Sequence, residues 1–492
     1  MPAKARSTEA AGMLDFGRWP ALLATTAAVS GTAAIVAVVV GALLAVLIAR
    51  TDLPGRRLLL ALLLLAACVP GYVTMTLVVS VVPLWRLAGS ALAAGGLYAL
   101  VHAPLAALIL AAALRRGDRE LEDLARLDAG ELRVLWSVTF RQCGWALAAA
   151  GLVVALLVSA DYSITDLLTV RTFAEEVYTQ FALQRAGVAT LAPSLPLLAL
   201  GLGGIAALWL AARRGAGPTR DWPLGAPPRT IRLRVWRWPL AGACALVVLA
   251  VAAPVGRSLM VHIESFQAFV ESLAALRGEL TLTATLALLA AAVIVGLSIA
   301  LAWAAVRTRV AALALCCGMV LLLASPAPVI GISLIELLNH PHWGPWLYDT
   351  PASVVLGYVV RFLPLAIVLL CPAVQRIPVE MELAARLDGC DWLHTQRHIV
   401  RPLVRRDAAT AFLVVCVLCV GELPCTMLLA PPGWTPVSVR SFTLLHFGVY
   451  RDLAVLAIAA GLVIVPPWLG LVLLLRRGLE SEAGRVTVGD RS

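Results

Sequence analysis

The sequence predicts an all-α polytopic membrane protein with two tandem, homologous halves, on the strength of its composition and of an internal duplication. Of the 492 residues, 61% are hydrophobic and only 14% are charged, and the mean hydropathy is +0.90. These values lie far outside the range of soluble globular proteins. We therefore expect the chain to reside in a lipid bilayer.

Apolar runs of about 20 residues, enough for a helix to cross roughly 30 Å of hydrocarbon, predict about 11–12 membrane helices. In the first half these runs lie near residues 20–49, 58–82, 89–114, 143–160 and 194–212. In the second half they lie near residues 238–256, 279–305, 311–336, 351–374, 407–428 and 453–475.

The duplication is seen most directly in one tetrapeptide. Ala125-Arg126-Leu127-Asp128 recurs as Ala385-Arg386-Leu387-Asp388, and each copy lies in a polar loop between apolar runs. At nearly the same spacing, Tyr98 and Tyr358 correspond, as do the pairs Asp161 with Thr165 and Glu422 with Thr426. Internal repeats of this kind are typical of transporter folds.

The repeat predicts the domain organisation. We expect a first transmembrane domain at 1–214 and a second at 237–492. The segment 215–236 is rich in Pro, Gly and Arg, a composition typical of a linker. Most Lys and Arg residues fall on one side if both tetrapeptide loops are cytoplasmic, as the positive-inside rule requires. We attribute the net charge of +10 to this orientation and expect no nucleic-acid partner.

The polar loop of the second half has the pattern of a helix, a turn and a second helix. Met381, Leu383 and Leu387 are spaced to form one face of a helix over 380–393. Gly389 permits a tight turn, and Pro402 favours a new helical start. On geometry alone, an ordinary amphipathic connector explains this pattern equally well.

The same loop resembles a family motif. Glu382, Ala384, Ala385, Gly389, Ile399 and Pro402 resemble the "EAA" loop of permeases of binding-protein-dependent ATP-binding-cassette (ABC) importers, with the Gly, Ile and Pro spacings matched. The match departs from the pattern at Leu383, which stands at its Glu, and at Arg401, which stands at its Leu.

The loop of the first half is more degenerate. Asp123, Leu124 and Ala125 stand at the EAA places, Ala129 and Gly130 at the Gly, and Gln142 at the Pro. The resemblance implies a role in ATPase coupling for a set of residues in the two loops: Asp123, Ala125, Arg126, Asp128, Gly130, Glu382, Ala384, Ala385, Arg386, Asp388, Gly389, Ile399 and Pro402.

Over its whole length the chain looks like the fused, double-length permeases of the ferric-iron and thiamine group, with type I-like transmembrane domains. The features that carry this are Arg50-Thr51-Asp52-Leu53-Pro54-Gly55 and Gly421-Glu422-Leu423-Pro424. The resemblance implies a multi-pass protein of the bacterial cytoplasmic (inner) membrane. It also implies two partners, an ABC ATPase homodimer and a periplasmic or lipid-anchored substrate-binding protein, and a solute such as ferric iron, thiamine or a related small molecule.

The sequence also indicates that the ATP-hydrolysing subunit, the motor of transport, is a separate chain. The only lysine is Lys4, whereas a Walker A loop needs a lysine to reach the nucleotide phosphates. We therefore expect no enzymatic activity and no cofactor in this chain.

Candidate residues for the substrate pathway come from the repeat, because acids within or bordering a membrane are costly. They are Tyr98, Asp161, Thr165, Tyr358, Glu422 and Thr426. The alternative is that the acids cap helices and the tyrosines pack between them. We expect no metal site: His394 and His398 are one helical turn apart but have no evident third ligand. The Cys416–Cys419 pair lies in an apolar run.

Two other functional classes remain open. A secondary active transporter with two repeated halves would also show duplication, but such carriers usually have ionisable residues in mid-span for ion coupling. Here Arg361 is the main candidate. A membrane enzyme would need a convergent cluster of catalytic groups, and the sequence indicates none.

Overall fold

The computed structural model describes most of the chain, and everything below refers to that part. The described residues are 16–71, 73–74, 86–115, 118–182, 195–211, 230–246, 266–339, 341–342, 344–447, 455–456 and 458–474. They form helices and turns, with one isolated β-bridge between Thr51 and Ile231. The all-α fold expected from the sequence is confirmed.

The chain divides into two compact units, Met1–Glu264 with Ala324–Val329, and Ser265–Leu323 with Ile330–Ser492. The predicted domain limits at 214 and 237 describe the sequence repeat and stay a prediction, whereas the compact units divide further along. The difference arises because Leu233, Leu240 and Cys244 pack beside Ile48 and Leu59 in the first unit. Most of the predicted linker lies outside the described residues.

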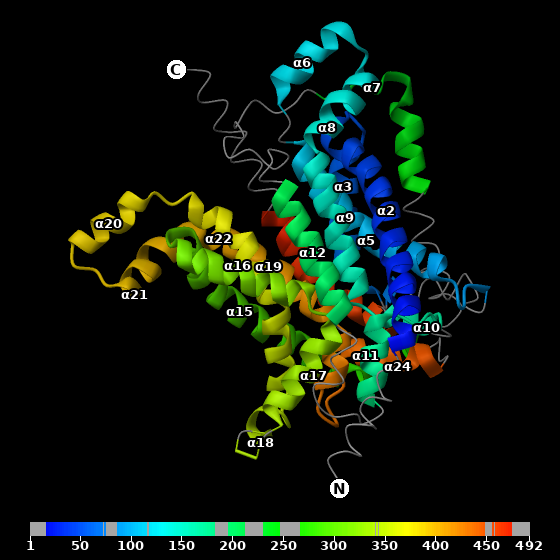
Figure 1. The fold of residues 1–492 in the computed structure, drawn as a ribbon, viewed down its shortest axis with the longest axis vertical. Coiled ribbons are helices and arrows are strands. Elements are labelled where there is room, and N and C mark those ends of the chain that lie inside the picture. Colours follow the sequence, from blue (N-terminus) through cyan, green and yellow to red (C-terminus); the bar gives the residue numbers. More distant parts are fainter. Residues whose placement is uncertain are drawn as a thin grey trace. The chain divides into compact units, whose positions relative to one another are not determined.

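The first unit is organised around one long helix, α2 (Trp19–Arg50), which packs against α5 and α9. Helix α6 lies at one end of this bundle and α11 at the other (Figure 1). The elements of the unit are η1 (Phe16–Arg18), α3 (Arg56–Cys68), α5 (Ala91–Leu114), α6 (Arg119–Asp128), α7 (Glu131–Val134), η3 (Leu135–Thr139), α8 (Phe140–Gln142), α9 (Gly144–Ser159), α10 (Ser163–Leu167), α11 (Phe173–Ala182), α12 (Leu195–Ala211) and η6 (Arg234–Trp236).

The second unit repeats this plan around α15 (Arg277–Arg307), which packs against α19 and α22. Helix α20 lies at one end of its bundle (Figure 1). The remaining elements of the second half are α14 (Phe266–Ala275), α16 (Arg309–Ala324), α17 (Ala327–Leu338), α18 (Gly344–Leu347), α19 (Ala352–Gln375), α20 (Val379–Leu387), α21 (Trp392–Thr395), η7 (Gln396–Val400), α22 (Arg401–Gly421), α23 (Pro424–Leu429) and α24 (Val437–Phe447). Both η3 and η7 are π-helical and follow the polar loop of their unit.

Four described helices, α2, α5, α15 and α19, are long and apolar enough to cross a membrane. Counting each bent pair as one span raises the number to six within the described residues. One bent pair joins Glu131–Gln142 to α9 at 66°. Several predicted spans run into residues outside the described ranges, so the total of about 11–12 stays a prediction.

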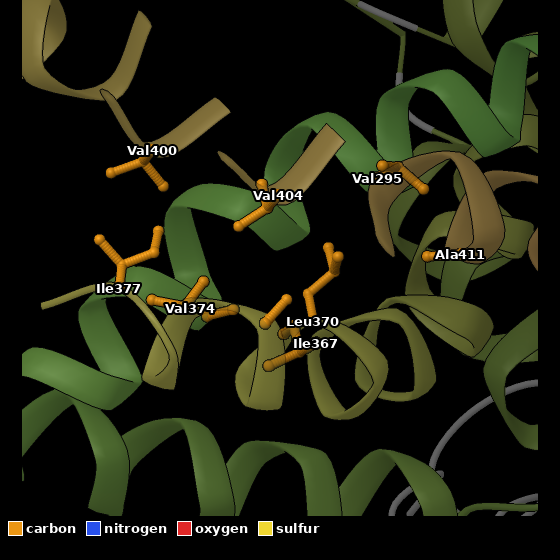
Figure 2. Close-up of a cluster of buried hydrophobic side chains, with 10 residues drawn as sticks. Val295, Ile367, Leu370, Val374, Ile377, Val400, Val404 and Ala411 are labelled. Atoms are coloured by element: carbon orange, nitrogen blue, oxygen red, sulfur yellow. The ribbon is translucent and has the colours of Figure 1, made fainter. Parts of the chain in front are cut away.

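A buried cluster of aliphatic side chains fixes the base of the polar loop in the second unit. It joins α15, α19, η7 and α22, and Figure 2 shows its members, among them Val295, Ile367, Val374 and Val404. Ile377 just before α20 and Val400 at the end of η7 both belong to this cluster (Figure 2). The two ends of the loop are thus anchored in one core, while α20 extends away from it.

Candidate functional site

The second polar loop is the predicted helix, turn and helix. Helix α20 ends at Leu387, and Gly389 follows with φ +82°, a left-handed conformation that favours glycine. The Gly389 N–H donates to Arg386 O (3.0 Å) and the Cys390 N–H to Ala385 O (3.0 Å), which closes the helix end. Asp391 then caps α21, because its Oδ1 accepts from His394 N–H at 2.7 Å. The helix, turn and helix are therefore present, but the first helix is shorter than the predicted range 380–393, because the turn at Gly389 ends it at Leu387.

The face of α20 that the protein buries is not the apolar one. Glu382 and Ala385 are buried, whereas Met381, Leu383 and Leu387 are exposed. A helix that exposes its leucines and buries an acid has reversed the usual pattern of a surface helix. Within the part of the chain that the structure describes, this apolar side is left exposed.

Glu382 is held in a buried network by α15. Arg307 donates from Nη2 (2.6 Å) and Nε (3.0 Å) to Glu382 Oε1. The Trp303 indole N–H donates to Glu382 Oε2 (2.9 Å), and Arg307 Nη2 also donates to Ile377 O (2.9 Å). Both carboxylate oxygens are therefore hydrogen-bonded, as a buried charge requires.

The first unit contains the same arrangement. Arg50, at the end of α2, forms an ion pair with Glu122 of α6, and both side chains are buried. Thr139 Oγ1 donates to Glu122 Oε1 (2.9 Å), and Arg50 Nη1 donates to Leu114 O (3.1 Å). Each loop helix is thus tied to the end of a long helix, α2 or α15.

Sequence reasoning missed Glu122, Arg50 and Arg307. We placed Asp123 at the family's Glu position, but superposing the two Ala-Arg-Leu-Asp tetrapeptides aligns Glu122 with Glu382. That comparison could have found it. Asp123 instead lies half-buried and accepts from Arg126 Nη1 at 2.7 Å, and Arg126 also contacts Glu131 (3.3 Å).

The remaining predicted coupling residues are more accessible. Ala125 and Ile399 are half-buried, and the others are exposed: Asp128, Gly130, Ala384, Arg386, Asp388, Gly389 and Pro402. The turns of the two loops also differ. Ala129, which stands at the place of Gly389, is extended with φ −143°, and Gly130 has φ −70°, so neither adopts the left-handed conformation of Gly389.

Exposed leucines are a second feature that the two loops share. Leu127 and Leu387, at the same place of the repeated tetrapeptide, are 81% and 88% exposed. Leu121, Leu124 and Leu132 add to this surface in the first loop. Apolar side chains exposed in a cluster commonly mark an interaction site.

The predicted pathway residues of the second unit form one buried network. Tyr358 Oη and Thr426 Oγ1 are 2.9 Å apart. Glu422 accepts from the backbone N–H groups of Cys425 (3.0 Å) and Thr426 (2.9 Å), which caps α23. Arg361 Nε lies 3.5 Å from Glu422 Oε1.

The first unit uses its equivalents in a similar way. Tyr98 Oη donates to Asp161 O (3.0 Å) and accepts from Ile164 N–H (3.3 Å). Asp161 Oδ1 accepts from Ser163 N–H (2.8 Å) at the start of α10, and Thr165 is buried beside it. These contacts give both acids a helix-capping task. A place on the substrate pathway stays a prediction.

His394 and His398 stack with ring centroids 4.0 Å apart. Among the residues that the structure describes, no group of three or more His, Cys, Asp or Glu side chains could hold a metal ion.

Comparison with known proteins identifies the class. Residues 292–477 match the family described as the binding-protein-dependent transport system inner membrane component. This stretch contains the second polar loop and the helices α19 and α22 that flank it. This part of the second half is therefore similar to the permease domains of this family.

Similarity to whole permeases extends the match to both halves. The Fe(3+)-transport system permease protein FbpB 2 of Haemophilus influenzae is 24% identical over 447 residues, covering 86% of this chain and 83% of that protein. The two comparisons together support a fused permease of the ABC importer class, similar to the iron group.

Shorter matches fall on relatives with other named solutes. The putative 2-aminoethylphosphonate permease PhnV of Salmonella typhimurium is 27% identical over 168 residues, 34% of this chain and 60% of that protein. The trehalose permease SugB of Mycobacterium tuberculosis is 28% identical over 159 residues, 31% of this chain and 57% of that protein. The names of the relatives thus agree on transport and differ on the solute.

Proposed function

We propose that this chain forms the translocation pathway of an ATP-driven importer in the bacterial cytoplasmic membrane and couples to a separate ABC ATPase homodimer through α6 and α20. One observation carries the proposal. Both loop helices bury a glutamate against the end of a long apolar helix and expose leucines on the other side. A motor subunit that covered these leucines would bury apolar area at two equivalent places.

The solute is proposed to be ferric iron, with thiamine or a related small molecule as the alternative within the same permease group. The support is the similarity to a permease named for Fe(3+) transport, which covers most of both chains. We propose further that a periplasmic or lipid-anchored binding protein delivers the solute, because the matching family is described as binding-protein-dependent. ATP binding would draw the two loops together and reorient the pathway as a population shift.

The coupling surface is tested by purifying the tagged chain from its native membrane in mild detergent and quantifying co-purifying proteins by mass spectrometry. We expect a nucleotide-binding subunit at about two copies per chain, as a homodimer on two symmetric loops requires. In the double variant Leu127→Ser with Leu387→Ser, the amount of co-purified ATPase should fall at least about tenfold. Truncating apolar anchors of an interface should cost more than the roughly 1.4 kcal/mol to which a tenfold loss of affinity corresponds.

The matched control is Trp346→Ser. Trp346 is also a large, exposed apolar residue (79%), but it lies on α18, which is well separated from α20 (Figure 1). Its variant should retain the ATPase. Full retention of the ATPase by the double leucine variant would contradict the assignment of the loops.

A further inference from the structure

The long helices α2 and α15 are each fixed at both ends by equivalent polar contacts. At the loop end, Arg50 pairs with Glu122 and Arg307 with Glu382. At the opposite end, Thr26 Oγ1 accepts from the Phe173 N–H (3.1 Å). In the second unit, Thr283 Oγ1 accepts from the Val437 N–H (2.9 Å).

These contacts join each long helix to two others. Phe173 begins α11 and Val437 begins α24, so the threonine end holds the start of a helix remote from the polar loop. The threonine and the arginine are separated by the same number of residues in α2 and in α15. At 1.5 Å per residue this spacing is about 36 Å, longer than the roughly 30 Å of a bilayer's hydrocarbon core.

All of these contacts are buried and are therefore costly to break. All four side chains that form the ion pairs are buried or nearly so. Removing one partner of a buried pair leaves an uncompensated charge, so the loop helix cannot separate from the long helix at low cost. The threonine hydroxyls are buried too, and an unpaired buried backbone N–H is also costly.

We propose that α2 and α15 are matched rods that carry motor-driven displacement of α6 and α20 across the membrane to α11 and α24. In this arrangement Arg50, Glu122, Arg307 and Glu382 are positioning residues, and Thr26 and Thr283 hold the far ends. The inference rests on the proposed function and adds that the first loop couples as well, despite its degenerate motif, because its ion pair has the same construction.

The main test measures solute uptake and ATP hydrolysis by the chain reconstituted with its ATPase. Glu382→Gln and Glu122→Gln remove the buried charge but keep the size of the side chain. Each variant should still assemble and hydrolyse ATP, while uptake per ATP falls at least about tenfold, because a loosened pair no longer moves the long helix with the loop. Thr283→Val should lower the same ratio at the far end.

Two further variants separate transmission from general damage. Arg307→Lys keeps the positive charge beside Glu382 but cannot donate from both Nε and Nη2 to Oε1, and it should keep uptake per ATP within about threefold of the wild-type ratio, because the buried carboxylate stays paired with a cation. Asp407→Asn removes an exposed ion pair of the same unit, with Arg376 at 2.8 Å, and should leave the ratio unchanged.

Unchanged uptake per ATP in both glutamine variants would overturn the proposal, and so would uptake and hydrolysis falling strictly together. If uptake per ATP falls in Glu382→Gln but not in Glu122→Gln, the extension of the proposal to the first half is overturned.

A second measurement needs no motor and therefore separates this proposal from the proposed function. Amide hydrogen exchange of α20 in the purified chain should accelerate at least about tenfold in Glu382→Gln but not in Asp407→Asn. If exchange accelerates but the chain never recruits an ATPase, the proposed link between α15 and α20 stands and the proposed function fails. If exchange does not change, the link is overturned.

Discussion

Glu382 shows how one side chain sets the orientation of a whole loop. Its two oxygens accept three hydrogen bonds from Arg307 and Trp303, so α20 turns its acid inward and its leucines outward. A buried ion pair is weak evidence for stability, because desolvation offsets most of the attraction, yet removing one partner costs about 3–5 kcal/mol. The main effect of the pair is therefore to fix the orientation of α20. It keeps Leu387 exposed at the tip of the loop.

Gly389 is the second residue on which the loop depends. With φ +82° and its N–H donating to Arg386 O, it cannot be replaced by proline, which fixes φ near −65° and has no N–H. We expect Gly389→Pro to lower ATP-driven uptake at least about tenfold without preventing insertion into the membrane, since the change lies beyond the end of α20.

Gly389→Asn is the matched control, because asparagine tolerates the left-handed region better than other residues with a Cβ. It should retain at least about half of the uptake. Uptake and membrane content of both variants are compared in whole cells or vesicles. Normal uptake by Gly389→Pro would show that coupling does not depend on the turn at Gly389.

At the scale of the elements, the packing of α2 against α5 decides the geometry of the first unit. Small residues let the two backbones approach closely, as in many membrane helix pairs. A Cβ built on Gly95 would lie 2.7 Å from Thr32 Cβ and 2.8 Å from Val29 O, and one on Gly41 would lie 2.9 Å from Ala106 Cβ. Contacts this short force the helices apart. Because Arg50 of α2 also pairs with Glu122 of α6, a shift of α2 against α5 would also move the polar loop of the first unit.

Neighbouring glycines of α5 provide a test of that interface. Gly95→Ala should destabilise the protein by about 1–3 kcal/mol through overpacking, whereas Gly96→Ala should be neutral or slightly stabilising, because a Cβ at Gly96 meets open space and alanine favours the helix. Thermal unfolding of the two variants in the same detergent measures the difference. Equal midpoints would show that the close α2–α5 approach does not constrain the unit.

At the scale of the whole molecule, the two units repeat one design. Each has a long helix, a polar loop that ends in a π-helical segment, a tyrosine near an acid that caps a short helix, and a threonine that holds a later backbone N–H. The sequence could predict the helices, the duplication and the helix–turn–helix of the second loop, because hydropathy and a repeated tetrapeptide are local signals.

The buried contacts were harder to predict. Arg50 and Glu122 are far apart in the chain, and an arginine at the end of an apolar span is usually explained by orientation alone. The exposed face of α20 also opposes the usual rule, because a partner rather than the chain's own core is expected to cover it. The segment around Leu240 packs on the first unit, and no local pattern indicated that contact.

The central claim is that transport through this chain is driven by ATP on a separate motor. It is tested most directly by reconstituting the purified permease with its ATPase and binding protein in liposomes and measuring uptake of radiolabelled ferric iron, with thiamine in parallel. We predict uptake that requires ATP and persists when ionophores collapse all ion gradients. Uptake by the chain alone, driven by an ion gradient and indifferent to ATP, would contradict the account and identify a secondary carrier.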